Sequence, residues 1–259
     1  MKGRVPILVL LLGVGLASNA QQQPIRAKQY PLEWPQIKSD EQVYIHLGYS
    51  CSYNQNTLIP NWVAYELTSE EVNPETKVKG KESFRWDPNT NGVNTAYRED
   101  YKNEAGWQRG HMAPRADMRW SLQAYEESFF LSNICPQNGV LNAGDWATTE
   151  KLARRIATRY GSVYIVCGPI IGKNKYGTLG AHHVVIPDAF FKALLVNING
   201  EYHSIAMVLP NESEHHDPQY YWLTVNELED LVGLDFFPGL DDTIEEDVEN
   251  SFDRSIWGR

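Results

Sequence analysis

An extended segment and a long amphipathic helix, about thirty residues apart, constrain the fold of this chain more than any other feature. The segment 108–113 lies between a glycine turn at Gly106 and Pro114, and the residue before a proline avoids the helical region, so we expect an extended backbone there. Residues 144–160 have apolar side chains at helical spacing with charged residues between them, and Gly161 ends the helix. The chain is therefore expected to combine strands and helices in this region.

The rest of the chain mixes strands and helices without regular alternation. Strands are predicted at 43–53, 61–67, 129–134, 163–167, 184–198 (interrupted by Pro187) and 203–209. Helices are predicted at 122–127 and, after the capping box of Thr224 and Glu227, through Leu231 to Gly233. Residues 70–104 are predicted to be mostly loop. This order favours an α+β fold over a doubly wound sheet.

The N-terminal segment has the pattern of a secretory signal. Lys2 and Arg4 precede an apolar stretch from Val5 to Leu16, and small residues precede a cleavage point after Ala20. Residues 1–20 are therefore predicted to be a signal peptide, 21–42 a polar lead-in and 43–259 a single domain. The apolar stretch is too short for a membrane span, although an uncleaved anchor is the alternative. We expect an exported protein, periplasmic or extracellular, with no membrane span in its mature form.

The charge balance disfavours binding to nucleic acid through a broad basic surface. The sequence holds 23 basic and 33 acidic residues, and without Lys2 and Arg4 the net charge is −12. Proteins that bind polyanions non-specifically usually have a basic face. Part of the acid is a run at 241–247, and a local basic cleft stays open because six arginines lie around the two segments described above. These are Arg109, Arg115, Arg119, Arg154, Arg155 and Arg159.

Three cysteines, Cys51, Cys135 and Cys167, lack the spacing of a zinc site. Each lies in an apolar, strand-like run, which favours the role of a small buried hydrophobic residue. A disulfide between Cys135 and Cys167 is the alternative in an oxidising compartment.

The residues suited to chemistry lie on the extended segment and along the helix. His111 follows Arg109 and Gly110, and a neutral imidazole can take a proton from water. Asn142 offers an oxygen ligand to a hard cation, with Glu150 acting through water. Eight helical steps leave these two residues about 80° apart in azimuth, so both can face one cleft. Arg154 lies one turn beyond Glu150 and offers a guanidinium to phosphate. These are the parts of a phosphodiester hydrolase that uses one metal ion.

Each of these residues also has an ordinary structural interpretation. Asn142 fits a helix N-cap, Glu150 and Arg154 fit a surface ion pair, and His111 fits a histidine at a strand end. Their occurrence together favours the chemical interpretation. The remaining histidines lack a metal-binding spacing and are interpreted as turn or surface residues: His46, His182, His183, His203, His215 and His216. No nucleophile elbow, Walker loop or dinucleotide motif occurs.

At these residues the chain resembles the DNA/RNA non-specific endonucleases, the ββα-metal (His-Me finger) nucleases that include endonuclease G. The resemblance rests on three blocks, 108–111, 132–137 and 141–146, followed by Glu150. Further similarity occurs at 61–65, 166–169 and 234–237, so that about residues 43 to 250 are covered. The family implies a ββα-metal fold with a central, mostly antiparallel sheet flanked by helices.

The resemblance also implies roles. His111 would be the general base, Asn142 the direct protein ligand of Mg²⁺, and Glu150 a contact to that ion through water. Arg109 and Arg154 would contact phosphate, with Arg115 as a further substrate-binding residue. The substrates would be DNA and RNA, cut to leave 5′-phosphate ends. The cofactor would be Mg²⁺, with Mn²⁺ as a substitute, and a homodimer stays open.

Two positions depart from the family pattern. The family usually has aspartate where this chain has Gln108, and a neutral amide keeps hydrogen bonds but not the charge. His46 stands where many members have an arginine that contacts phosphate. These departures, together with the net negative charge, leave two alternatives open: a catalytically weak nucleic-acid-binding homologue, and a phosphodiesterase for small substrates.

Overall fold

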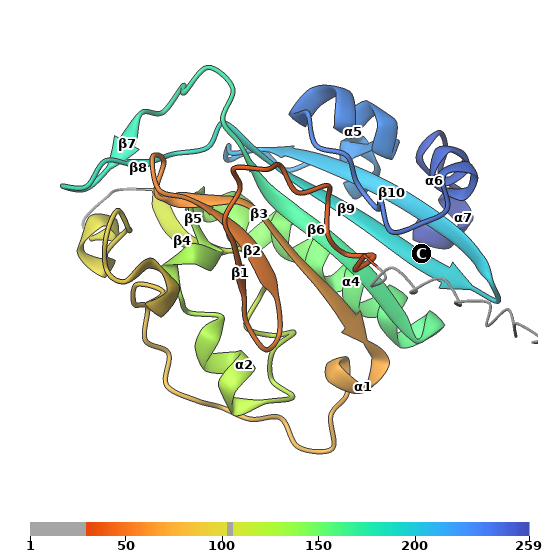
Figure 1. Cartoon of the computed structure of the whole chain (residues 1–259), viewed down its shortest axis with the longest axis horizontal. Helices are drawn as coiled ribbons and strands as arrows, with labels where there is room; N and C mark the ends of the chain where they lie inside the picture. The colour runs from red at the N-terminus through yellow and green to blue at the C-terminus, as the bar shows by residue number, and fades with distance from the viewer. Residues whose placement is uncertain (1–29, 103–105, 259) are drawn as a thin grey trace, which may run out of the picture.

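One antiparallel sheet of seven strands runs through the molecule (Figure 1). The computed structural model describes residues 30–102 and 106–258, and within them the strand order is β1-β2-β3-β6-β9-β10-β11. The strands are β1 Val43–Ile45, β2 Ser50–Asn54, β3 Ile59–Thr68, β6 Ser162–Ile170, β9 Ala189–Ile198, β10 Glu201–Pro210 and β11 Trp222–Leu223.

Two short ribbons stand apart from this sheet. The first joins β4 Trp107–His111 to β5 Ile134–Asn138, and the second joins β7 Thr178–Leu179 to β8 Val184–Val185. Both pairs are antiparallel. The β4–β5 ribbon carries the Arg-Gly-His sequence.

The helices are short except for one. They are α1 Ser69–Val72, α2 Leu122–Glu127, α3 Gly139–Leu141, α4 Ala147–Tyr160, α5 Val225–Val232, α6 Asp242–Glu249 and α7 Arg254–Trp257. A π-helical turn, η4 Asn142–Trp146, joins α3 to α4. Short 3₁₀ turns lie at Pro88–Thr90 (η1), Arg98–Tyr101 (η2), Leu131–Asn133 (η3) and Pro218–Tyr221 (η5).

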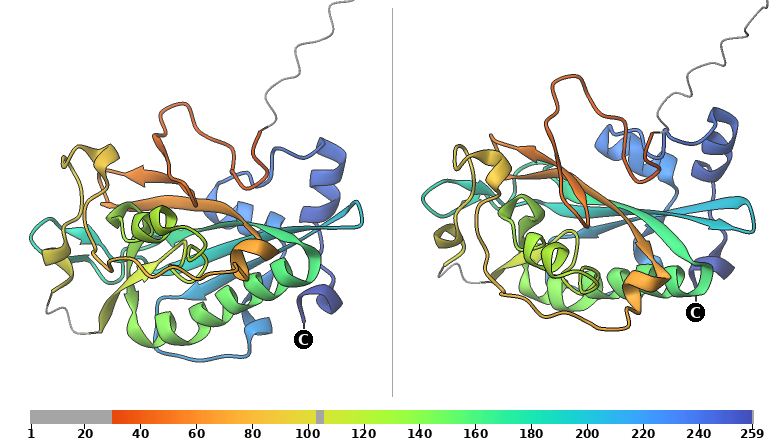
Figure 2. Two further views of the ribbon diagram at one scale, coloured as in Figure 1. Left: turned by 90° about the horizontal axis from the view of Figure 1, so that it is seen from below. Right: turned by 60° about the horizontal axis from the view of Figure 1, so that its bottom comes forward.

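Each face of the large sheet buries its own apolar cluster. The larger cluster lies between the sheet and α4, and includes Leu152 and Ile156 from that helix. The smaller cluster lies on the opposite face, where Val225 of α5 and Trp62 of β3 are buried. Figure 2 shows α4 on one side of the sheet and α5 and α6 on the other. The molecule is therefore a three-layer α+β structure, as predicted.

Residues 30–42 pack against the smaller cluster. The Trp34 ring lies 6.2 Å from the Tyr30 ring and 6.4 Å from the buried Trp62 ring. The Gln36 N–H donates to the Asp235 carbonyl at 2.8 Å. Polar composition did not reveal this contact, because a single tryptophan and isoleucine give no periodic pattern.

Local signals predicted several elements correctly. Residues 122–127 form α2, and Thr224 makes the predicted capping box with Glu227 at the start of α5. Gly233 adopts the left-handed conformation that ends α5, with φ of 65°. Gly161, with φ of 100°, follows the last residue of α4. These signals succeed because they act through a few neighbouring residues.

Two predicted strands are wrong in extent. Residues 43–53 form two strands, β1 and β2, that pair antiparallel across a turn at 46–49. Residues 129–134 contain a 3₁₀ turn, and the strand begins only at Ile134. The turn is held by the buried Asn133 amide, which donates to the carbonyls of Ala113 and Ser128 and accepts from the Ala113 N–H. Tertiary hydrogen bonds thus override the strand propensity of the aromatic residues.

The predicted signal peptide at 1–20 and the first part of the lead-in lie outside the described residues. Within the part of the chain that the structure describes, no helix is long and apolar enough to cross a membrane.

The cysteine prediction is confirmed in its main form. Cys51, Cys135 and Cys167 are all buried and none forms a disulfide. The alternative disulfide between Cys135 and Cys167 is therefore wrong. The Cys167 thiol instead donates to the Met112 carbonyl at 3.4 Å.

Candidate active site

The β4–β5 ribbon positions His111 and requires a glycine before it. Gly110 pairs with Cys135, and a Cβ at Gly110 would lie 2.6 Å from the Gln137 Cβ. No side chain fits at that distance, so the close packing of Gln137 explains why glycine separates Arg109 from His111. The following residue, His111, is the last of β4.

Packing buries one of the two imidazole nitrogens of His111. Its Nε2 is buried and has no hydrogen-bond partner among the described residues. The Phe84 and Phe129 rings lie 5.5 and 5.3 Å from the imidazole. Burial, together with the positive charges of Arg115 and Arg109, lowers the pKa of His111 to about 3. The imidazole is therefore neutral at pH 7, with a lone pair available on one nitrogen.

Asn142 lies where α3 continues into η4, inside a continuous helical stretch and not at its N-terminus. Its backbone angles are helical, φ −56° and ψ −47°, and the N-cap of α3 is Asn138. The Asn142 Nδ2 donates to the Gln108 Oε1 at 2.8 Å. Because this hydrogen bond uses the amide nitrogen of Asn142, its side-chain oxygen stays available to bind another group. The interpretation of Asn142 as a plain N-cap is therefore wrong.

The ribbon and the helix are tied together directly. The Trp146 Nε1 donates to the His111 carbonyl at 3.1 Å, and Gln108 reaches Asn142 from the same strand. The Trp146 ring is fully buried. These two bonds fix the relative positions of His111 and Asn142.

Glu150 and Arg154 belong to a buried charge cluster with Asp117. The Arg154 Nη1 lies 2.6 Å from the Asp117 carboxylate and 3.9 Å from the Glu150 carboxylate. The Tyr65 hydroxyl donates to Asp117 at 3.0 Å. Only 15% of the Glu150 side chain and 23% of the Arg154 side chain are exposed. The pair is thus not the surface pair of the ordinary interpretation.

Burial dominates the electrostatics of this cluster. It raises the pKa of Glu150 to about 7, an effect that the charges of Lys192 and Arg154 oppose and that of Asp117 reinforces. Lys192 is also fully buried, with its Nζ 4.1 Å from the centre of the Trp146 ring and no hydrogen-bond partner in the described part of the chain. Burial lowers the pKa of Lys192.

Sequence reasoning missed Asp117 and Lys192. Asp117 lies in an irregular turn, where neither helical nor strand periodicity predicts burial. Lys192 lies in the middle of β9, and the presence of a lysine inside an apolar run was a signal in the sequence that could have been used.

The three arginines predicted to contact phosphate differ in whether a carboxylate of the protein already pairs with them. The Arg109 guanidinium lies 4.4 Å above the Phe84 ring, and no ion pair to it occurs among the described residues. Arg154 uses one nitrogen on Asp117, which leaves other N–H donors of its guanidinium. Arg115 pairs with Glu82, and its side chain is 51% exposed.

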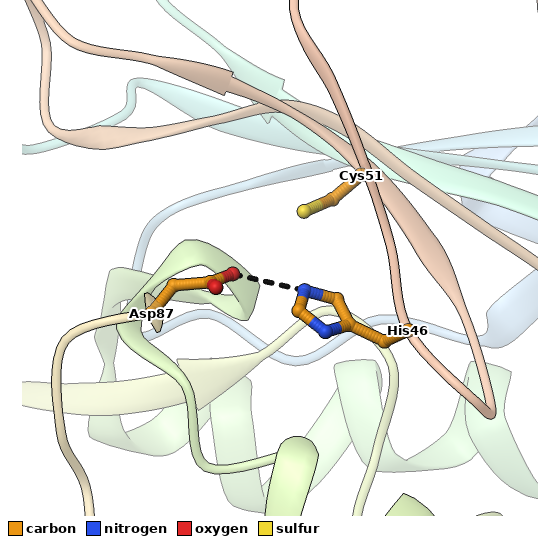
Figure 3. Close-up of side chains that lie close together, drawn as sticks. All are labelled: His46, Cys51 and Asp87. Carbon is orange, nitrogen blue, oxygen red and sulfur yellow. Dashed lines mark hydrogen bonds and ion pairs between the residues drawn. The ribbon is translucent and has the colours of Figure 1, made fainter. Parts of the chain in front are cut away.

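A second cluster of titratable groups contains His46, Cys51 and Asp87 (Figure 3). His46 lies in a turn as predicted, but its side chain is only 4% exposed and its Nε2 is 2.9 Å from the Asp87 Oδ2. Asp87 also accepts from the Ser132 hydroxyl at 2.5 Å and from the Asn89 N–H at 2.9 Å. Burial and the nearby Asp87 charge raise the pKa of Cys51, which disfavours the thiolate that a metal ion needs. The contacts support a structural role that holds the β1–β2 turn.

The structure therefore ties His111 to the helical stretch that carries Asn142, and pairs Glu150 with Arg154 further along that stretch, in α4. Asn142 and Glu150 offer oxygen atoms from one helical stretch, and oxygen donors are the type that suits a hydrated hard cation. Arg109 lies on the same ribbon as His111, and Arg115 is close enough to lower the pKa of His111 by its charge. His46 is buried against Asp87 and so does not present its ring to a substrate.

Comparison with known proteins finds one family over most of the chain. A model of the DNA/RNA non-specific endonuclease family matches residues 34–243. The mitochondrial nuclease EXOG of Danio rerio is 36% identical over 203 residues, which are 73% of this chain and 59% of that protein. Human EXOG is 33% identical over 220 residues, 79% of this chain and 59% of that protein. Human mitochondrial endonuclease G is 30% identical over 217 residues, 79% of this chain and 70% of that protein.

A solved structure shows the same fold. The crystal structure of the EndoG/EndoGI complex superimposes with a TM-score of 0.73 at 27% identity, covering 81% of this chain and 89% of that one. The predicted ββα-metal fold is thereby confirmed, with β4, β5 and α4 as its elements. The chain spans about 60% of the length of the EXOG proteins it matches.

The names of these relatives correct the expected location. EXOG and endonuclease G are named as mitochondrial proteins, which contradicts an exported, periplasmic or extracellular protein. The sequence pattern was ambiguous because transit peptides also carry basic residues and lack acidic ones, and the first acidic residue here is Glu33.

The match over residues 34–243, the relatives at 30% identity or more and the ribbon-and-helix site lead to one conclusion. This chain belongs to the DNA/RNA non-specific endonuclease family.

Proposed function

We propose that the protein is a Mg²⁺-dependent nuclease that hydrolyses phosphodiester bonds in DNA and RNA with His111 as the general base. One observation carries this proposal: a neutral His111 is tied by the Trp146 hydrogen bond to the helical stretch that presents Asn142. A buried imidazole nitrogen without a hydrogen-bond partner lowers the stability of the fold, and such a cost is typical of a functional site.

The donor set fits a divalent metal ion. The side-chain oxygen of Asn142 would bind the ion directly, since Gln108 occupies the amide nitrogen. Glu150 would contact it through water, in keeping with the preference of Mg²⁺ for oxygen ligands and retained waters. When bound, the ion would supply positive charge that stabilises the phosphate and the leaving oxygen in the transition state. Mn²⁺ shares these preferences and is expected to substitute.

His111 would act on the attacking water. The water oxygen would form a bond to phosphorus while its proton passes to the imidazole of His111. The bond from phosphorus to the 3′ oxygen would break, and that oxygen would take a proton from solvent water. The products would be a 5′-phosphate and a 3′-hydroxyl end. Arg109 and the remaining donors of Arg154 would hold the phosphate oxygens, with Arg115 as a further contact. None of these groups reads a base, which supports cleavage without sequence preference.

Digestion of plasmid DNA and total RNA by the full chain tests this function. Cutting of both substrates with Mg²⁺, none with EDTA, and strong loss in Asn142→Ala are expected. Asn226→Ala is a matched control, since Asn226 lies on α5 across the sheet. End-labelling with and without phosphatase identifies the 5′ group.

Three outcomes would contradict the proposal in different ways. Nucleic acid binding without cutting would favour a binding homologue, and hydrolysis of bis(p-nitrophenyl) phosphate alone would favour a small-substrate phosphodiesterase. Cutting by Asn142→Ala at the wild-type rate would show that Asn142 is not the metal ligand.

A homodimer also stays a prediction. Analytical ultracentrifugation of the full chain tests it.

A further inference from the structure

The segment between β10 and η5 packs tightly onto the turn that carries Asn142. Asp145, in that π-helical turn, accepts from the Tyr221 hydroxyl at 2.6 Å and from the His216 N–H at 3.2 Å. The His215 Nδ1 lies 3.1 Å from its other oxygen. The segment 211–221 is thus held in a fixed position beside the proposed metal ligand.

The outer side of this segment presents two stacked aromatic rings. The His216 and Tyr220 rings lie 4.2 Å apart and 26° from parallel. Tyr220 is 69% exposed, more than any other exposed large hydrophobic residue among those described. The Tyr221 ring, which is buried, braces both edge-on at 5.8 and 5.4 Å. The two rings are therefore supported by Tyr221 on their inner side and exposed to solvent on their outer side.

The charges around these rings select against a phosphate contact. Glu214 is 75% exposed, with its carboxylate 3.5 Å from the His216 Nε2, and Asp217 caps η5. Asp145 adds a third carboxylate beneath the rings. Carboxylates repel the phosphate backbone, so a ligand here must present an uncharged flat surface. The face of a nucleobase is such a surface, and stacking on an aromatic ring is how proteins hold unpaired bases.

We propose that His216 and Tyr220 form a stacking platform for an unpaired nucleobase of a single-stranded substrate, on a segment bonded to Asp145 in the turn that also carries Asn142. This inference rests on the proposed function. In a duplex the base faces cover one another, so only single-stranded or frayed nucleic acid can use the platform. The platform thereby discriminates single strands from duplexes at a site that does not touch phosphate.

Binding in EDTA tests the platform without cleavage. The probe is a short single-stranded oligonucleotide that carries 2-aminopurine, whose fluorescence falls on stacking, with the same sequence as a duplex for comparison. For Tyr220→Ala we expect the Kd for the single strand to rise by about 5- to 100-fold and the quenching to be lost, as for removal of one stacked base. Tyr220→Phe keeps the ring and should keep both properties.

A matched control comes from a second histidine–tyrosine pair. The Tyr97 and His182 rings lie 4.7 Å apart on another part of the surface, so Tyr97→Ala should bind the probe like the wild type. The platform is wrong if Tyr220→Ala binds the single strand normally, if it weakens duplex and single strand equally, or if the wild type does not bind the single strand. If the wild type quenches the probe but does not cut nucleic acid with Mg²⁺, the nuclease proposal is wrong and the platform is retained.

Discussion

At the scale of single residues, His111 makes the sharpest prediction about the chemistry. Because its pKa is about 3, it should be neutral throughout the physiological range and available as a base. His111→Ala should lower the cleavage rate by about 10²–10⁴-fold, the usual effect of removing a positioned general base. Steady-state cleavage of a labelled oligonucleotide measures this. His183→Ala, which changes an exposed histidine, is the control, and a His111→Ala rate equal to wild type would exclude this mechanism.

Gln108 should act on the metal ion through Asn142. Its Oε1 accepts from the Asn142 Nδ2 and so orients the oxygen that would bind the ion. Gln108→Leu removes this acceptor, and the affinity for Mg²⁺ should fall by about 10-fold or more, as when other groups that orient ligands are removed. Gln108→Glu keeps an acceptor and should retain the affinity. Calorimetric titration with Mg²⁺ compares the three proteins. An unchanged affinity in Gln108→Leu would show that Asn142 is oriented by other contacts.

Glu150 predicts a dependence of stability on pH when no metal ion is bound. Its carboxyl has a pKa of about 7 in the folded protein, above its ordinary value, so the folded state holds the proton more tightly than the unfolded chain. This contribution is fully present below the unfolded pKa and is lost as the pH rises through 7. From pH 5 to pH 8 it should lower the free energy of unfolding by about 2 kcal/mol.

Glu150→Gln removes the titration and serves as the comparison. Urea denaturation in EDTA should show the stability of the variant rising relative to wild type by that amount over the same pH range. A constant difference between the two proteins would mean that the folded site does not favour the protonated carboxyl.

At the scale of elements, the β4–β5 ribbon depends on one glycine. In Gly110→Ala the new methyl group would meet the Gln137 Cβ at 2.6 Å, and a Cβ moves only with its backbone. Such overpacking typically costs about 1–3 kcal/mol, so thermal unfolding should occur at a lower temperature. In Gly144→Ala the clash is with the far end of His215, which is 57% exposed and can turn away. A Gly110→Ala protein as stable as Gly144→Ala would contradict this reasoning.

The elements of the site show which features can be predicted from the sequence and which cannot. Local patterns predicted an extended segment at 108–113 and a helix at 144–160, where the structure has β4 at 107–111 and α4 at 147–160. Local patterns and a family resemblance also selected His111, Asn142, Glu150 and Arg154. The π-helical turn and the partners Asp117 and Lys192 were not predicted. They depend on contacts between segments that are far apart in the chain, and such long-range contacts cannot be read from a single sequence. The strand expected at 129–134 failed for the same reason, because Asn133 bonds to Ala113.

At the scale of the whole molecule, the acidic charge is partly separated from the site. The helix α6, with Asp242, Glu245 and Glu249, packs on the opposite face of the sheet from α4 (Figure 2). Burial and the neighbouring Glu229 raise the pKa of Glu249 to about 9, so this carboxyl is neutral at pH 7. The net charge of −10 therefore overstates the negative field at the ribbon and helix.

This distribution predicts a weak dependence of nucleic acid binding on salt. If Arg109, Arg154 and Arg115 are the main phosphate contacts, log K for duplex DNA should fall with log salt with a slope of about −3. Arg109→Ala should reduce the magnitude of the slope by about 1, because that guanidinium has no ion pair among the described residues. Arg159→Ala, at the far end of α4, should leave it unchanged.

Binding titrations in EDTA at several salt concentrations measure these slopes. A slope of about −8 or steeper would require many more phosphate contacts than this site offers, and would place the substrate on a broad basic surface instead. A slope that is unaffected by Arg109→Ala would remove Arg109 from the phosphate contacts. The expected small slope follows from the structure as a whole: an acidic molecule that binds a polyanion only through the few arginines of this site.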